Sequence, residues 1–157
     1  MLKRILSAAK SIALPLLVGL LAALLVGDNF ELYDVLIKPP FALPGNLFAL
    51  FWTLLYLLMG VSLFLFKRST ESEKAKNDGI LFFYTQLFLN FLWPIVFFNF
   101  ELPFTAFILL IALFIFTAIT TMIFYQSNRI SGILLLPYLA YIIYAGYLNF
   151  AIWFLNL

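Results

Sequence analysis

The chain has 157 residues, of which 66% are hydrophobic and 10% charged, and its formal net charge is +2. Soluble domains are about 45–50% apolar and about 25% charged, so this chain lacks the charged residues that a water-covered surface needs. It has no basic stripe and no nucleic-acid motif. Cysteine and histidine are both absent. Their absence excludes disulfides, most structural zinc sites and the usual haem-iron ligands.

Five stretches are long and apolar enough to cross a hydrocarbon layer about 30 Å thick, which takes roughly 20 mostly apolar residues. Among the nine basic and seven acidic residues, only Lys10 lies inside one of them, near its start, where the side chain can reach the headgroups. The five stretches are residues 5–26, 46–66, 79–98, 105–125 and 132–155. We therefore predict an all-α integral membrane protein, a single bundle of five transmembrane helices.

Basic residues concentrate at one end of this predicted bundle. They are Lys3, Arg4, Lys10, Lys67, Arg68, Lys74, Lys76 and Arg129. Only Lys38, in the first loop (27–45), belongs to the other end. The positive-inside rule then predicts a cytoplasmic N-terminus and a C-terminus across the membrane. The first residues also resemble a secretory signal peptide, but the apolar run is long for one and no A-x-A site follows, so we expect the first span to be retained.

The connections carry further signals. In the first loop, Phe30, Tyr33 and Leu36 recur at helical spacing with acidic residues elsewhere around the turn. This predicts a short amphipathic helix on the membrane, ended by the pair Pro39-Pro40, which is either a lid or an interfacial anchor. Residues 67–78 are predicted as a charged loop. Two prolines inside the third and fifth spans, Pro94 and Pro137, should loosen those helices locally.

Neutral polar and aromatic residues form one stripe on each of three predicted helices. The stripes are Trp52, Tyr56 and Met59 on the second, Gln86, Asn90, Trp93 and Phe97 on the third, and Tyr138, Tyr141, Ala145 and Asn149 on the fifth. If they converge, they form an aromatic pocket with a few hydrogen-bonding groups, as small-molecule sites usually have. The alternative is plain packing, since Asn and Gln in membranes often bond a neighbouring helix for about 0.6 kcal/mol.

Chemistry of the conventional enzymatic kind is not expected. All seven carboxylates lie in loops or at helix ends, so there is no catalytic constellation or metal cluster, and the mid-membrane acid that proton-coupled transport requires is missing.

Three threonines on the fourth span, Thr117, Thr120 and Thr121, are predicted to hydrogen-bond their own backbone.

Four segments together form a specific pattern. They are Lys38–Pro40 with Pro44 leading into Phe51–Gly60, then Gln86–Trp93, Leu135–Tyr138 and Ala145–Trp153. In order and spacing this pattern resembles the family of the tryptophan-rich sensory protein (TspO) and the translocator protein, once called the peripheral benzodiazepine receptor. The resemblance runs from the first loop to the C-terminus, and the chain length and five spans agree with it.

The resemblance implies a five-helix bundle, usually a homodimer, in this case in a bacterial cell membrane, with a ligand pocket open towards the first loop. It implies porphyrin or haem as ligand, with sterols and synthetic benzodiazepine- or isoquinoline-type molecules as others, and no required cofactor. The implied roles are transport, stress sensing or, in some bacterial members, light-dependent porphyrin breakdown. The pocket positions carried over are Trp52, Asn90, Tyr138, Tyr141 and Ala145, with Phe41 and Pro44 from the loop. Tyr56 and Trp93 complete the predicted site, with Lys38 at its lip beside the porphyrin propionates.

The chain departs from the family pattern at three positions. Phe41 and Tyr141 stand where the family commonly has tryptophan, and the photochemical breakdown is thought to need a tryptophan pair. Phe154 follows Trp153 where the sterol motif has a basic residue, so that motif is incomplete in this chain. Three hypotheses follow: a porphyrin-binding sensor or translocator, a light-dependent porphyrin-degrading enzyme, or a structural bundle without a small ligand. Because only Tyr or Met could ligate iron here, we expect metal-free porphyrin to bind about as well as haem.

Overall fold

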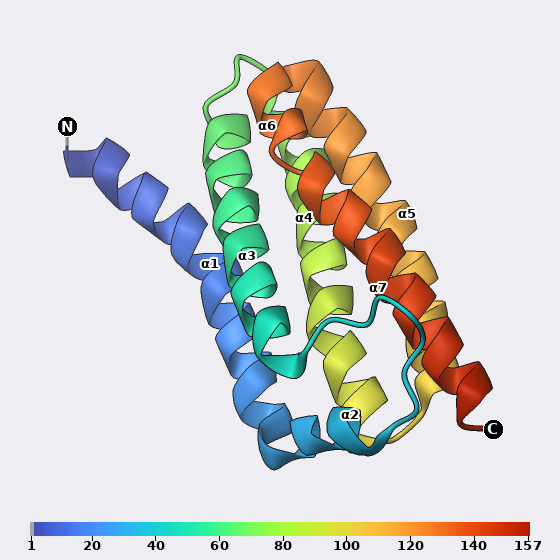
Figure 1. Cartoon of the computed structure of the whole chain (residues 1–157). Coiled ribbons are helices and arrows are strands. Elements are labelled where there is room, and N and C mark those ends of the chain that lie inside the picture. Colours follow the sequence, from blue (N-terminus) through green and yellow to red (C-terminus); the bar gives the residue numbers. More distant parts are fainter. Residues whose placement is uncertain (1) are drawn as a thin grey trace.

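The computed structural model describes residues 2–157, which form helices joined by short connections (Figure 1). The elements are α1 (Leu2–Val26), η1 (Gly27–Glu31), α2 (Leu32–Val35), α3 (Gly45–Lys67), α4 (Glu73–Pro94), η2 (Ile95–Asn99), α5 (Pro103–Ser127), α6 (Arg129–Ile133) and α7 (Leu136–Leu155). Five segments of this described part are long and apolar enough to span a membrane. The all-helical, five-span prediction is therefore confirmed.

The third span begins earlier than the sequence predicted. α4 starts at Glu73, not at residue 79, so the charged loop shrinks to the short connection between α3 and α4. Ser72 caps the helix, and its side chain accepts a hydrogen bond from the Ala75 amide at 3.3 Å. The first turn of α4 is charged and lies outside the apolar stretch, which is why a hydropathy argument does not detect it.

Both prolines that were expected to disturb helices mark a change of helix geometry. Pro94 ends α4, and the chain continues as one π-helical turn, η2. The fifth span is divided, because α6 ends at Ile133 and α7 begins at Leu136, so that Pro137 occupies the first turn of a new helix. Proline has no N–H to donate to the preceding turn, which makes a helix start its favoured position. Pro103 likewise opens α5.

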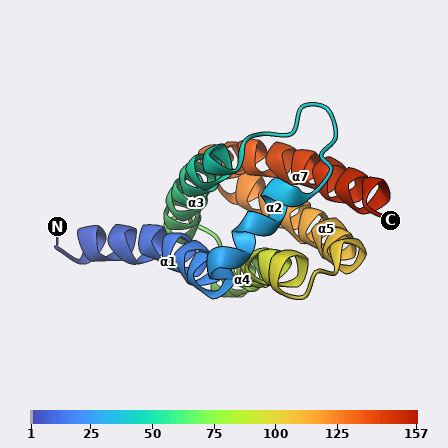
Figure 2. The same ribbon diagram turned by 60° about the horizontal axis from the view of Figure 1, so that its bottom comes forward.

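The first loop contains two short helical pieces instead of one amphipathic helix. The 3₁₀ helix η1 runs directly into α2, which ends at Val35, before the Pro39-Pro40 pair. Of the predicted apolar face, Tyr33 is buried and Leu36 is partly buried, whereas Phe30 is exposed like Asp28 and Asp34, so the division into two faces is only partly present. The loop then crosses towards α7 before it enters α3 (Figures 1 and 2).

The helices surround a common core in the order α1, α3, α7, α5 and α4, and α3 approaches α7 less closely than the other neighbours approach each other. The N-terminus, the α3–α4 connection and α6 lie at one end of the bundle, which we call the basic end, and α2, the first loop and the C-terminus lie at the other (Figure 1). This agrees with the predicted grouping of basic residues; which end faces the cytoplasm remains a prediction.

Candidate functional site

Trp52 is the centre of an aromatic cluster that joins three helices. Its ring lies 5.8 Å from that of Tyr56 on the same helix, 6.1 Å from Trp93 on α4, and 6.2 Å and 5.3 Å from Tyr138 and Tyr141 on α7, centroid to centroid. Aromatic pairs at such spacings contribute about 0.5–1.5 kcal/mol each beyond the burial of their surface. The three predicted stripes therefore do face one another.

A chain of hydrogen bonds runs beside these rings. The Tyr56 hydroxyl donates to Asn90 Oδ1 at 2.5 Å, and Asn90 Nδ2 donates to the Tyr138 hydroxyl at 2.8 Å. All three side chains are buried, so their polar atoms would be costly to leave unpaired in a membrane. One amide on α4 thus satisfies a phenol from α3 and another from α7.

A second polar link lies nearer the end of the bundle that carries the first loop. Trp93 Nε1 donates to Asn149 Oδ1 at 2.8 Å, and Asn149 Nδ2 donates to the carbonyl of Pro103 at 2.7 Å. Because Pro103 begins α5, this side chain fixes the relative positions of α4, α5 and α7. It also orients the Trp93 ring towards Trp52.

Tyr141 fills the space between α3 and α7. Its ring stacks on Phe51 at 5.7 Å and meets Phe48 edge-on at 6.4 Å, in addition to Trp52. Its hydroxyl is buried and has no hydrogen-bond partner among the residues described. An unpaired phenol in an otherwise satisfied cluster is a group that a ligand with an acceptor atom would stabilise.

The first loop is hydrogen-bonded along α7. The Leu43 amide donates to the Tyr144 hydroxyl at 3.1 Å, and that hydroxyl donates to the carbonyl of Phe41 at 2.9 Å. Tyr147 donates to the Pro40 carbonyl at 3.2 Å, and Asn156 exchanges two 3.0 Å bonds with the backbone of Ile37. The loop is therefore attached to the helix that carries Tyr138 and Tyr141.

Comparison with known proteins shows where this architecture belongs. A sequence profile of the TspO/MBR family matches residues 11–154. The chain is 36% identical to a tryptophan-rich protein TspO of Archaeoglobus fulgidus over 97% of this chain and 98% of that one. It is 33% identical to the protein of that name in Chlorobaculum tepidum, over 98% of both chains, and 34% identical to a translocator protein of Bos taurus over 89% of this chain and 84% of that one. The chain belongs to the TspO/MBR family.

This TspO/MBR protein brings six of the ten predicted site residues into one place, the aromatic cluster with its amide. They are Trp52, Tyr56, Asn90, Trp93, Tyr138 and Tyr141. Ala145 is buried on the same face of α7, one turn beyond Tyr141.

The three loop positions lie apart from the cluster. Phe41 is 88% exposed and has a φ of +67°, so its ring points away from the bundle. Pro44 is exposed and precedes the first residue of α3. Lys38 Nζ donates to the carbonyl of Asp34 at 3.2 Å and lies 4.9 Å over the Tyr33 ring. In this arrangement none of these three residues contacts the aromatic cluster, so they do not line the predicted site.

Sequence reasoning missed the residues that attach the loop and one feature of the core. Tyr33, whose hydroxyl donates to the Leu43 carbonyl at 2.9 Å, and Tyr144 are ordinary tyrosines in a chain that has eight.

Thr120 and Thr121 do bond their own backbone, as predicted, but the Thr117 hydroxyl finds no partner within residues 2–157. Gln86, 1% exposed, is also without a partner in that range. The core thus retains unused hydrogen-bonding capacity.

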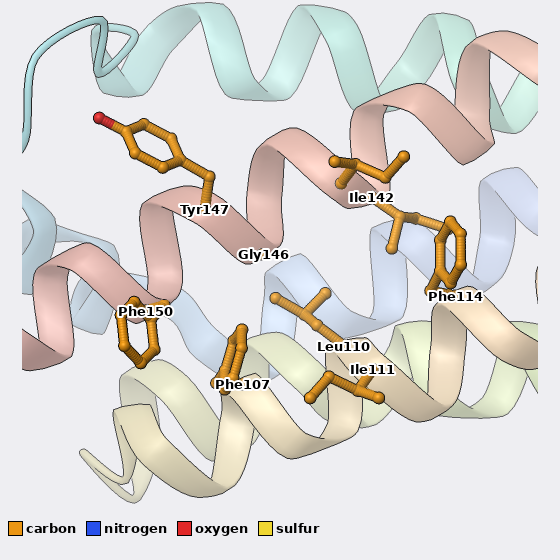
Figure 3. A pocket seen from close by; sticks show the side chains of 9 residues that line it. Phe107, Leu110, Ile111, Phe114, Ile142, Gly146, Tyr147 and Phe150 are labelled. Carbon is orange, nitrogen blue, oxygen red and sulfur yellow. The ribbon is translucent and has the colours of Figure 1, made fainter.

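An outer groove between α5 and α7 is distinct from the aromatic cluster. It has a volume of about 420 Å³ and shares none of the predicted site residues. Figure 3 shows its apolar lining and Tyr147, whose hydroxyl turns away from it. Because almost nothing polar lines this groove, it offers no group that would orient a ligand.

Proposed function

We propose that this protein binds a flat, largely apolar molecule of the porphyrin class in the aromatic cluster around Trp52, and acts in sensing or transport from a bacterial cell membrane. The observation that supports this most is the placement of Trp52 against rings of α4 and α7, beside the Asn90 amide. Aromatic faces stack on a macrocycle, and an amide reaches a ring nitrogen or a carbonyl.

The route we propose for entry is the space between α3 and α7. These two helices approach each other less closely than the other neighbours do, and Tyr141 fills the space with its unpaired hydroxyl. A bound macrocycle would displace the Tyr141 ring from Phe51 and Trp52 and take its place against them. Because the loop is attached to α7 by hydrogen bonds, it would move with that helix.

The proposal is tested by fluorescence-quenching titration of the purified chain in detergent with protoporphyrin. Trp52→Ala and Asn90→Ala should each weaken binding about tenfold, because each removes a stacking face or a bond worth about 1–1.5 kcal/mol. Phe88→Ala, which removes an exposed aromatic from α4, should leave the affinity unchanged. Retention of helical content by circular dichroism separates lost binding from lost folding.

Two outcomes would contradict this function. Absence of saturable quenching in the unmodified chain would favour the structural bundle, in which the rings only pack against each other. Loss of the porphyrin absorbance on illumination of the complex would favour the degrading enzyme. Protoporphyrin and haem are expected to bind within about threefold of each other, since the chain has neither histidine nor cysteine for the iron.

A further inference from the structure

A second groove lies at the basic end of the bundle, between α1 and α3, and shares no residue with the aromatic cluster. It has a volume of about 250 Å³ and is lined by Leu6, Ser7, Lys10, Ser11 and Lys67. Among the residues whose side chains the structure describes, two lysines, two serines and one leucine line it, and none of these is a carboxylate.

The groove exists because α1 and α3 cross closely and then diverge. At the crossing, a Cβ added to Gly60 would lie 2.5 Å from the Cα of Ile12. From there α1 tilts away from α3 towards the N-terminus, as both views show (Figures 1 and 2). Lys67 follows Gly60 by about two helical turns and so returns to the face that meets α1. Lys10 and Ser11 directly precede the crossing on the other helix.

The lining combines charge, hydroxyls and an apolar edge. Ser11 is 2% exposed and Lys67 is partly buried, whereas Lys10 and Leu6 are exposed. Ser7 and Lys10, and Ser7 and Ser11, are three and four residues apart, so all three side chains share one face of α1. One lysine from each helix together with two serine hydroxyls is a donor set for a tetrahedral oxyanion.

We propose that this groove binds the phosphate of an anionic phospholipid from the leaflet at the basic end. Lys10 and Lys67 hold the phosphate from opposite sides, the serine hydroxyls donate to its oxygens, and the acyl chain follows Leu6 down the outside of α1. The occupant is a lipid, and not a soluble anion, because the groove lies at the ends of two membrane-spanning segments, where lipid headgroups are found, and Leu6 gives it an apolar edge. Basic pockets between transmembrane helices on the cytoplasmic side bind acidic headgroups in this way.

The test is native mass spectrometry of the full chain with added phosphatidylglycerol, with phosphatidylcholine as the zwitterionic comparison. The double variant Lys10→Gln, Lys67→Gln should bind phosphatidylglycerol about 30-fold more weakly, at about fivefold for each cation near a membrane surface. The matched control is Lys74→Gln, Lys76→Gln, which removes the same charge at the same end from residues outside the groove; it should change the affinity by less than about threefold. Lys10→Arg, Lys67→Arg should retain binding.

Three results would overturn the proposal. One is an equal loss in the groove variant and its control, which would mean attraction to the whole basic end. Another is displacement of phosphatidylglycerol by millimolar inorganic phosphate, which would make this a site for a soluble anion. The last is equal binding of both lipids. If the double variant does not fold, Lys10→Gln alone decides the question, because Lys10 is exposed and its replacement removes no core contact.

Discussion

The Tyr56 hydroxyl donates to Asn90 Oδ1 at 2.5 Å and so joins α3 to α4 in the buried centre of the bundle. The same amide donates to Tyr138. Since a phenol can donate one hydrogen and an amide can both accept and donate, the single Asn90 side chain serves both tyrosines. Asn90 is therefore a structural link as well as a candidate ligand contact.

Asn90→Leu is expected to destabilise the bundle by about 1–2 kcal/mol, because two membrane-buried hydrogen bonds are lost and two phenols are left without their partner. Unfolding in a mixed detergent titration measures this. Thr85→Val is the control on the same helix, since Thr85 bonds only the carbonyl of Leu81. Equal stability of Asn90→Leu and the unmodified chain would contradict the linking role.

Gly60→Ala should destabilise the α1–α3 contact by about 1–3 kcal/mol, since the new methyl group would meet the backbone of Ile12 at 2.5 Å and the helices must separate. Gly146→Ala is the matched change on α7. Nothing lies within 4 Å of its added Cβ, so it should be neutral or stabilise by up to about 1 kcal/mol through helix propensity. Thermal unfolding of both variants compares the two positions, and similar losses at both would refute the assignment of close approach to Gly60.

Tyr144→Phe should release part of the first loop from α7, since one hydroxyl makes the bonds to Leu43 and Phe41. Two neutral hydrogen bonds contribute about 1–3 kcal/mol, so amide exchange at Leu43 should accelerate roughly tenfold or more. Hydrogen-exchange mass spectrometry of the loop peptide measures it. Tyr84→Phe, at an exposed position on α4, should leave the loop unchanged. An unaltered exchange rate in Tyr144→Phe would show that other contacts hold the loop.

The predicted orientation can be tested because the chain has no cysteine of its own. Single substitutions Thr70→Cys, between α3 and α4, and Ala42→Cys, in the first loop, lie at opposite ends of the bundle. In intact cells an impermeant maleimide should label only Ala42→Cys, because the positive-inside rule places the basic end in the cytoplasm. Labelling of Thr70→Cys from outside, with Ala42→Cys protected, would reverse the topology.

The sequence alone determined the membrane class, the five spans and the inward faces of three helices. These follow from local properties. A span needs a continuous apolar run. Each inward face is a stripe of polar or aromatic residues at helical spacing, and the three stripes contain Trp52, Asn90 and Tyr138 respectively. Its errors at the start of α4 and in the division of α6 from α7 arose where a cap or a proline, and not hydropathy, sets the boundary.

Only the tertiary structure decided which groups meet. That one amide serves Tyr56 and Tyr138, that Tyr144 attaches the loop, and that Phe41 points outward depend on the packing of segments far apart in the chain. The α1–α3 groove is of the same kind, since Lys10 and Lys67 become neighbours only through the crossing at Gly60. Helical periodicity fixes the direction of a side chain around its own axis, whereas the distance between two helices is set by the side chains that both contribute.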